Sequence, residues 1–189
     1  MEWKLPGTEL SIPPQEADSI SSLFESMFLP GGMVLSQVAS ITGLEPYTVQ
    51  NWVKRGLLSS PVGKRYTMRQ LCRIININTF KSILPMEKIC GLLTYINGQL
   101  DNDADDIIDD SELYFLFVKL AARVRLRDDE KVLTAAMNHA LEGYREPVPG
   151  ARRRVENTLK VMLTAWMAAQ LRQKAEEKLT EMEETIQVH

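Results

Sequence analysis

The chain has 189 residues, of which 44% are hydrophobic and 25% charged, a composition typical of a soluble globular protein. No stretch approaches the ~20 apolar residues that a membrane-spanning helix needs. The N-terminus does not show the basic and apolar pattern of a secretory signal. We therefore expect a cytoplasmic protein of one large or two small domains that stays out of the membrane.

The net charge of −3 is unevenly distributed along the chain. Residues 33–98 contain eight Lys and Arg but two Glu, which gives this segment a net charge of +6. Residues 99–112 contain seven Asp and Glu and no Lys or Arg, a net charge of −7. A basic module beside an acidic segment favours a protein that binds a polyanion.

Residues 1–32 are predicted to form an N-terminal arm with one short helix. Proline and glycine interrupt the first 19 residues, which therefore favour extended chain or loop. From Ser19 to Phe28 apolar residues recur on one helical face. The sequence Leu29-Pro30-Gly31-Gly32 is expected to end this helix.

Two short helices joined by a tight turn are predicted next. The first covers Leu35–Thr42, and Gly43 follows at the place where helices commonly end in a left-handed residue. Pro46 suits the first position of the second helix, Tyr47–Arg55, which Gly56 ends. Such a pair of helices is typical of the helix-turn-helix motif.

The apolar spacing also predicts which side of the second helix faces the core. Val49, Trp52 and Val53 form the inward side, so Trp52 is interpreted as a core residue rather than as a stacking platform for single strands. Residues 59–66 are too rich in helix breakers for a helix. They predict a tight hairpin or loop with Gly63 at its tip.

The rest of the chain is predicted to be helical apart from one acidic linker, so the fold class is mostly all-α. Further helices at Thr67–Ile83 and Met86–Asn97 complete a domain over residues 33–98. Residues 99–112 form the linker. Residues 113–189 form a helical bundle, interpreted as a possible dimerisation or effector domain, with helices at about Ser111–Arg127, Asp129–Tyr144 and Ala151–Thr185.

No metal site, cofactor or enzymatic activity is predicted. Cys72 and Cys90 fall in apolar helical patterns and are interpreted as buried thiols. A metal site needs three or four ligands, and neither of the two histidines, His139 and His189, lies near a cysteine in sequence. Acidic residues of 101–112 occupy five positions of a calcium-loop template, but Asp106 replaces the required glycine. No phosphate loop, HExxH or nucleophile elbow is present.

An ordered series of short motifs runs from residue 34 to residue 96. It consists of Leu35-Ser36-Gln37-Val38-Ala39, Thr42-Gly43-Leu44, Thr48-Val49, Trp52, Gly56-Leu57-Leu58, Arg65-Tyr66, Leu71 and Leu84-Pro85-Met86-Glu87-Lys88-Ile89. The series resembles the DNA-binding domain of the MerR family, which implies a winged helix-turn-helix with a recognition helix and a wing. The whole chain also resembles a bacterial family catalogued as a domain of unknown function, which implies DNA binding.

Eight residues form the predicted DNA-binding surface. Gln50 and Asn51 carry amides suited to bidentate contact with adenine, and Thr48 can bond a base or touch a thymine methyl group. Tyr47 is expected to bond a phosphate. The cations expected to neutralise backbone phosphates are Lys54, Arg55, Lys64 and Arg65.

These residues predict a transcriptional regulator that binds double-stranded DNA as a homodimer. The alternative is a protein–protein interaction module with a winged-helix fold that does not bind DNA. In the last helix, the apolar spacing favours packing on the neighbouring helices, with dimerisation at one exposed face. Whether a small-molecule effector binds, and which one, does not follow from the sequence.

Overall fold

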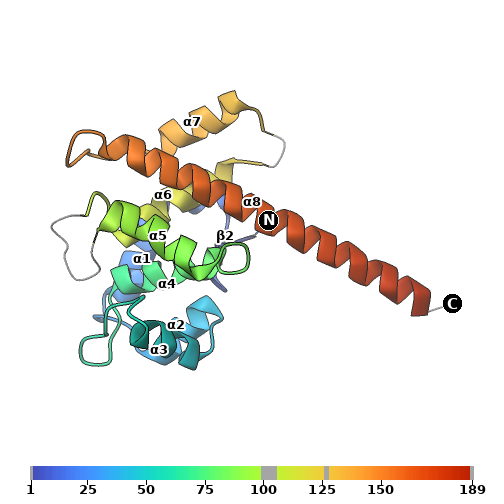
Figure 1. Cartoon of the computed structure of the whole chain (residues 1–189), viewed down its shortest axis with the longest axis horizontal. Helices are drawn as coiled ribbons and strands as arrows, with labels where there is room; N and C mark the ends of the chain where they lie inside the picture. The colour runs from blue at the N-terminus through green and yellow to red at the C-terminus, as the bar shows by residue number, and fades with distance from the viewer. Residues whose placement is uncertain (1, 99–105, 126–127, 188–189) are drawn as a thin grey trace.

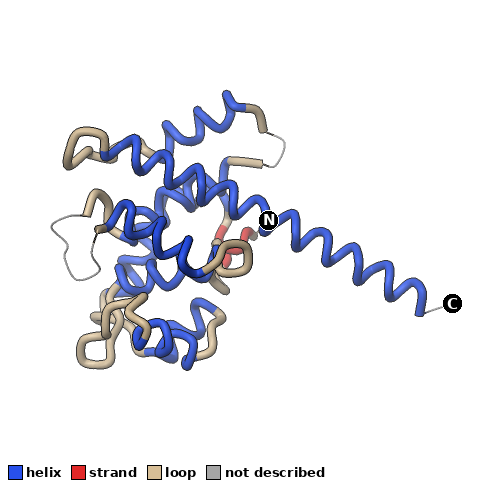
Figure 2. Tube along the Cα trace, in the orientation of Figure 1, coloured by secondary structure: helices blue, strands red, loops and turns tan. Residues whose placement is uncertain are grey.

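The computed structural model describes residues 2–98, 106–125 and 128–187, with side chains to Glu183. Most of these residues are helical, which confirms the predicted all-α class. The elements in chain order are β1 (Trp3–Lys4), β2 (Ser11–Ile12), a 3-10 helix η1 (Pro14–Ser19), α1 (Ile20–Phe28), α2 (Leu35–Thr42), α3 (Pro46–Lys54), α4 (Met68–Phe80), α5 (Met86–Asn97), α6 (Asp110–Arg123), α7 (Glu130–Ala140) and α8 (Ala151–Gln187) (Figures 1 and 2).

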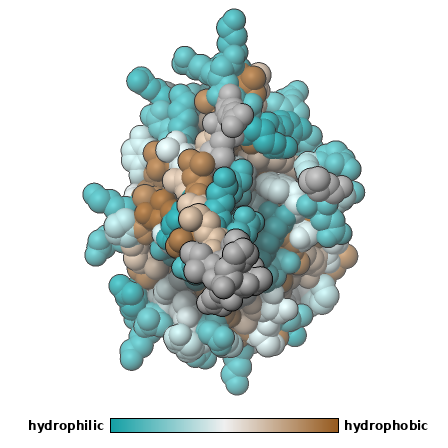
Figure 3. Space-filling view, turned by 90° about the vertical axis from the view of Figure 1, so that its right-hand side faces the viewer, coloured by the Kyte–Doolittle hydropathy of each residue, from teal (hydrophilic) through white to brown (hydrophobic). Residues whose placement is uncertain are grey.

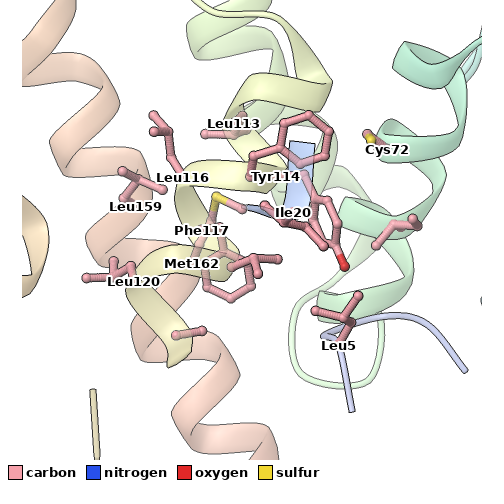
Figure 4. Packing of buried hydrophobic residues seen from close by; sticks show 14 of the residues in the cluster. Leu5, Ile20, Cys72, Leu113, Tyr114, Leu116, Phe117, Leu120, Leu159 and Met162 are labelled. Atoms are coloured by element: carbon pink, nitrogen blue, oxygen red, sulfur yellow. The ribbon is translucent and has the colours of Figure 1, made fainter. Parts of the chain in front are cut away.

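The central helix of the fold is α6. Apart from the half-buried Lys119, its side chains from Leu113 to Ala122 are apolar or aromatic and buried, as expected for a helix inside a protein. It packs against α4, α7, α8, η1 and α1. Figure 4 shows Tyr114 and Phe117 of α6 in one cluster with Met162 of α8. The hydrophobic core therefore runs continuously from the N-terminal half of the chain to α8.

The N-terminal arm, predicted to be extended chain or loop, is an ordered hairpin that packs on this core. Strands β1 and β2 pair antiparallel, and Leu5 between them is buried. Asn78 of α4 donates a hydrogen bond to Gly7 O (2.9 Å), and the Tyr114 hydroxyl donates to Pro6 O (3.0 Å). The strands have two residues each, too few to produce an alternating pattern in the sequence.

The described end of the acidic segment packs against α4. Arg69 Nη2 lies 2.6 Å from Asp106 Oδ2, and Arg73 Nη1 lies 3.3 Å from Asp110 Oδ2. Opposite charges on α4 therefore hold these carboxylates against the helix. Residues 99–105 of the predicted linker lie outside the described residues. They include the first three of the five acidic residues that match the calcium-loop template.

Helix α6 begins at Asp110, one residue before the predicted start at about Ser111. Asp109 precedes the helix and accepts a hydrogen bond from the Ser111 backbone N–H (2.8 Å). A carboxylate at this place satisfies a backbone donor at the helix N-terminus. Within the described parts of the chain, no helix combines the length and the apolar character needed to cross a membrane.

Candidate nucleic-acid interface

Helices α2 and α3 meet at a tight turn built on Gly43, at one end of the molecule (Figure 1). Gly43 has a φ of 66°, the left-handed conformation predicted for it, and its N–H donates to Ala39 O (2.8 Å). Leu44 is buried beneath the turn, and Pro46 is the first residue of α3. The short connection therefore fixes the direction in which α3 leaves α2.

One side of α3 packs into the core and the other faces solvent. Val49 and Trp52 are buried, as predicted, and Val53 is half-buried. On the opposite side Tyr47 is 69% exposed, and Thr48 is half-buried. The other predicted contact residues on and just after this helix, all exposed, are Gln50, Asn51, Lys54 and Arg55.

A tight β-hairpin follows α3, with Gly63 in its turn as predicted. Val62 and Arg65 form an antiparallel bridge, and the Arg65 N–H donates to Val62 O (2.9 Å). Gly63 and Lys64 between them have φ values of 56° and 62°. Positive φ at both central residues is typical of a type I′ turn. Lys64, at the tip of the hairpin, therefore adopts a backbone conformation that residues other than glycine rarely adopt.

The hairpin is fastened to the protein at its base. Tyr66 pairs with Met33, two residues before α2 begins, through backbone hydrogen bonds of 2.9 and 2.7 Å. Gln70 of α4 donates through Nε2 to Ser59 O (3.1 Å) and Ser60 O (3.2 Å). These contacts fix the position of the hairpin relative to α2 and α4.

A groove of about 560 Å³ lies between α2, α3 and the hairpin. Gln50 of α3 and Lys64 of the hairpin both line it, together with Ser36 of α2. The remaining lining is apolar and includes Val34 and Val53. Two residues predicted separately, from a helix and from a hairpin, thus border the same groove. Ser36 belongs to the first sequence motif but was not predicted to be a contact residue.

The two arginines of the predicted surface are placed differently from its lysines. Arg65 Nη1 donates to the carbonyls of Gly31 and Gly32 (3.0 Å each), so part of its guanidinium supports the loop before α2. Arg55, in contrast, lies near the Cys90 thiol of α5. Burial raises the pKa of this thiol, and the charges of Arg73 and Arg55 oppose that rise.

The basic surface is smaller than the charge count of residues 33–98 predicts. Arg69 interacts with Asp106, Asp109 and Asp110 at 2.6, 3.6 and 3.7 Å, and Arg73 is buried against Asp110. Both charges are thus compensated within the protein. Lys54 and Lys64 form no ion pair with any described residue.

Neither cysteine lies in a metal cluster within the part of the chain that the structure describes, where no three His, Cys, Asp or Glu side chains are arranged to hold an ion. Cys72 is buried, as predicted, and Cys90 is half-buried. Burial, with the nearby charges of Asp109 and Asp110, raises the pKa of the Cys72 thiol well above its usual value. Cys72 is therefore a protonated core residue at neutral pH.

The structure defines an all-α protein in which a short exposed helix and a hairpin border one groove. The chain belongs to the family described as Domain of unknown function (DUF1836), whose model matches residues 17–117. This match begins in η1 and ends within α6, so it contains the whole groove and the first part of the helix at the centre of the core.

The chain is also similar to "Uncharacterized protein YkrK" of Bacillus subtilis (strain 168). The two are 31% identical over 78 residues, which is 39% of this chain and 34% of that protein. The matched region thus spans about a third of the length of this curated relative. No solved structure matches the chain significantly.

Proposed function

We propose that this protein is a DNA-binding transcriptional regulator with a MerR-like helix-turn-helix, in which α3 is the recognition helix and the hairpin is the wing. The groove that Gln50 and Lys64 share carries the proposal. The major groove of B-DNA admits one α-helix. When α3 enters the major groove of the DNA, one sugar–phosphate strand of the duplex lies between α3 and the hairpin, beside the Lys64 ammonium group.

The exposed residues of α3 divide into two roles in this arrangement. Gln50 and Asn51 contact base edges, since their amides match the donor and acceptor pair of adenine in the major groove. Tyr47 and Lys54 border them on the same exposed helix and contact phosphates. Phosphate contacts set the affinity for all duplexes, whereas amide contacts set the preference for a sequence.

The regulator acts as a homodimer in this proposal. One recognition helix reads few bases, so such proteins commonly pair on half-sites about one helical turn apart. Its place of action is the cytoplasm, where bacterial DNA lies. The function requires no catalytic residue and no cofactor.

One observation favours a second function. Most of the groove lining is apolar, including Val34, Leu35 and Pro61, and apolar grooves also receive peptide side chains. A winged-helix module that binds a protein in this groove, without DNA, is the alternative.

Selection from a library of random DNA duplexes tests the proposal. The wild-type protein is expected to enrich a defined sequence. The double variant Gln50→Ala/Asn51→Ala is expected to stay bound to duplexes but to change the enriched bases. Asn138→Ala, on an exposed position of α7 far from α3, is the matched control and should leave the selected sequence unchanged. Failure of the wild type to retain any duplex would contradict the proposal and leave the protein-binding alternative.

A further inference from the structure

Helix α8 extends far beyond the body of the protein. In its first half Val155, Leu159 and Met162 are buried against the core. From Leu171 to Glu183 every side chain is exposed, and the helix continues to Gln187. Figure 1 shows this part projecting away from the other helices. At ~1.5 Å per residue it is roughly 25 Å long, and an isolated helix of this length is marginally stable in water.

The side of α8 that packs on the core becomes polar where the helix leaves the body. Leu159, Met162 and Trp166 lie on one side of the helix, since successive residues are rotated by about 100°. Gln173 and Glu177 continue this side in the projecting part. The projecting part is therefore not an extension of the core-facing surface.

A second, apolar stripe runs along the opposite side of α8. Val161, Ala168, Ala175 and Met182 recur at every seventh residue, and all four are exposed. Leu179, 55% exposed, lies between the last two on the same side. The space-filling view toward the C-terminal end of α8 shows a mostly hydrophilic surface with hydrophobic patches (Figure 3). Apolar residues spaced alternately four and three apart on a solvent-exposed helix, as Ala175, Leu179 and Met182 are, form the pattern of a coiled coil.

We propose that this stripe pairs with the same stripe of a second copy of the chain in a parallel, two-stranded coiled coil. In heptad terms, the residues that recur every seventh position are at d and Leu179 is at a. The outward positions between them are polar, as a two-stranded coiled coil requires: Gln173, Lys174, Glu177, Thr180 and Glu181. Arg172, at the preceding a position, donates to Ser82 O of the body (2.8 Å) and so is held away from the partner.

Charge complementarity determines both the partner and the orientation. Lys178 is at g and Glu183 is at e, so a parallel pair brings Lys178 of each copy beside Glu183 of the other. The two-fold symmetry forms this contact twice. An antiparallel pair would instead bring Glu176 of one copy towards Glu183 of the other, and like charges there repel.

This inference rests on the homodimer of the proposed function and names the element that forms it. Parallel pairing places both bodies at the same end of the coiled coil. Two copies of α3 then lie on one side of the dimer, where they can reach neighbouring half-sites. The pairing itself requires no DNA, so it is measured separately from DNA binding.

Sedimentation equilibrium of the full chain without DNA tests the pairing. We expect a dimer for the wild type and an increase of at least about 100-fold in the dissociation constant for Leu179→Lys. Thr180→Lys introduces the same side chain on the adjacent polar position and is expected to change the dissociation constant less than about twofold. A monomeric wild type, or a dimer that Leu179→Lys leaves intact, would overturn the inference. Because residues 171–183 do not pack on the core, circular dichroism of both variants should show a folded body.

A charge reversal tests the orientation. Lys178→Glu is expected to weaken the dimer roughly tenfold, and Lys178→Glu/Glu183→Lys should restore it, since the two charges then attract again across the interface. A double variant as weak as the single one would refute the parallel arrangement. The Leu179→Lys monomer also separates the two proposals. If it still binds duplex, more weakly than the wild type, then its DNA-binding surface is intact without dimerisation.

Discussion

Arg73 Nη1 of α4 lies 3.3 Å from Oδ2 of Asp110, the first residue of α6, and both side chains are buried. Arg73 also donates through Nε to Leu57 O (3.1 Å), in the segment between α3 and the hairpin. One guanidinium thus joins the central helix to the base of the proposed DNA-binding wing. Burial raises the pKa of Asp110, and the charges of Arg73 and Arg69 oppose that rise.

Removing one partner of this buried pair should cost more stability than removing both. Asp110→Ala leaves the Arg73 charge buried without its main counterion, which is expected to lower the free energy of unfolding by about 3–5 kcal/mol. Arg73→Met/Asp110→Leu replaces the pair by apolar groups and should cost at least ~2 kcal/mol less. Urea unfolding at neutral pH measures all variants. If the single and double variants lose the same free energy of unfolding, the unpaired buried charge is not the cause of the destabilisation.

Two glycines give opposite predictions for the same substitution. Gly7 has a φ of +72°, and a Cβ atom there would lie 2.3 Å from Thr79 Oγ1 and 2.5 Å from Ile75 O, so Gly7→Ala should destabilise by more than about 2 kcal/mol. Gly91 lies within α5 with open space around it, so Gly91→Ala should stabilise by about 0.5–1 kcal/mol. Thermal unfolding compares the two. A tolerated alanine at position 7 would show that the N-terminal hairpin is not held against α4.

The left-handed conformation of Lys64 predicts that stability and DNA affinity change in opposite directions. Lys64→Gly removes the strain of a positive φ and should stabilise the protein by about 1 kcal/mol, while it removes a phosphate contact and weakens binding to duplex. Lys64→Ala keeps the strain and loses the charge, so it should weaken binding equally without the gain in stability. Lys64→Gly with unchanged affinity would exclude this side chain from the interface.

The contacts of Asp18 predict a pH dependence of stability. Burial tends to raise the pKa of this carboxyl, but hydrogen bonds from Arg123 and His139 outweigh it and hold the pKa below its usual value of 3.8. The stabilisation is therefore complete above about pH 3.8 and is lost as the pH falls through the lower pKa of the folded state. Because Asp18 is 46% exposed, Asp18→Asn should cost no more than ~1 kcal/mol at pH 7. Urea unfolding at a series of pH values measures this dependence. A difference in the free energy of unfolding between Asp18→Asn and the wild type that persists at the lowest pH would contradict the prediction.

Local patterns predicted the helices around the candidate site closely. The structure gives α2 and α5 the predicted bounds, because Gly43 and Gly98 end them and Pro85 precedes α5. Helix α4 ends at Phe80 rather than at Ile83, since Lys81 to Leu84 form a turn before the proline. The inward side of α3 and the hairpin also followed from residue spacing and turn chemistry.

Contacts between distant parts of the chain could not be predicted in this way. Arg69 and Arg73 look like surface cations in the sequence, and only the fold shows that Asp106 and Asp110 compensate them. Similarly, the apolar spacing of α8 does not reveal where the helix leaves the core. The groove itself depends on where the hairpin lies relative to α3, which Met33 and Tyr66 determine by pairing across a gap in sequence. The division into an arm (1–32), a DNA-binding domain (33–98), a linker (99–112) and a helical domain (113–189) remains a prediction of which segments fold as separate units.

The salt dependence of binding to a duplex of random sequence tests DNA binding by this surface most directly. Contacts from Lys54, Lys64 and Arg65 predict that the logarithm of the association constant falls with the logarithm of salt concentration with a slope of about −3 per protomer. Lys54→Ala/Lys64→Ala should weaken binding at every salt concentration and make the slope shallower by about two. No binding at about 50 mM salt, or an affinity that salt does not change, would contradict the proposal.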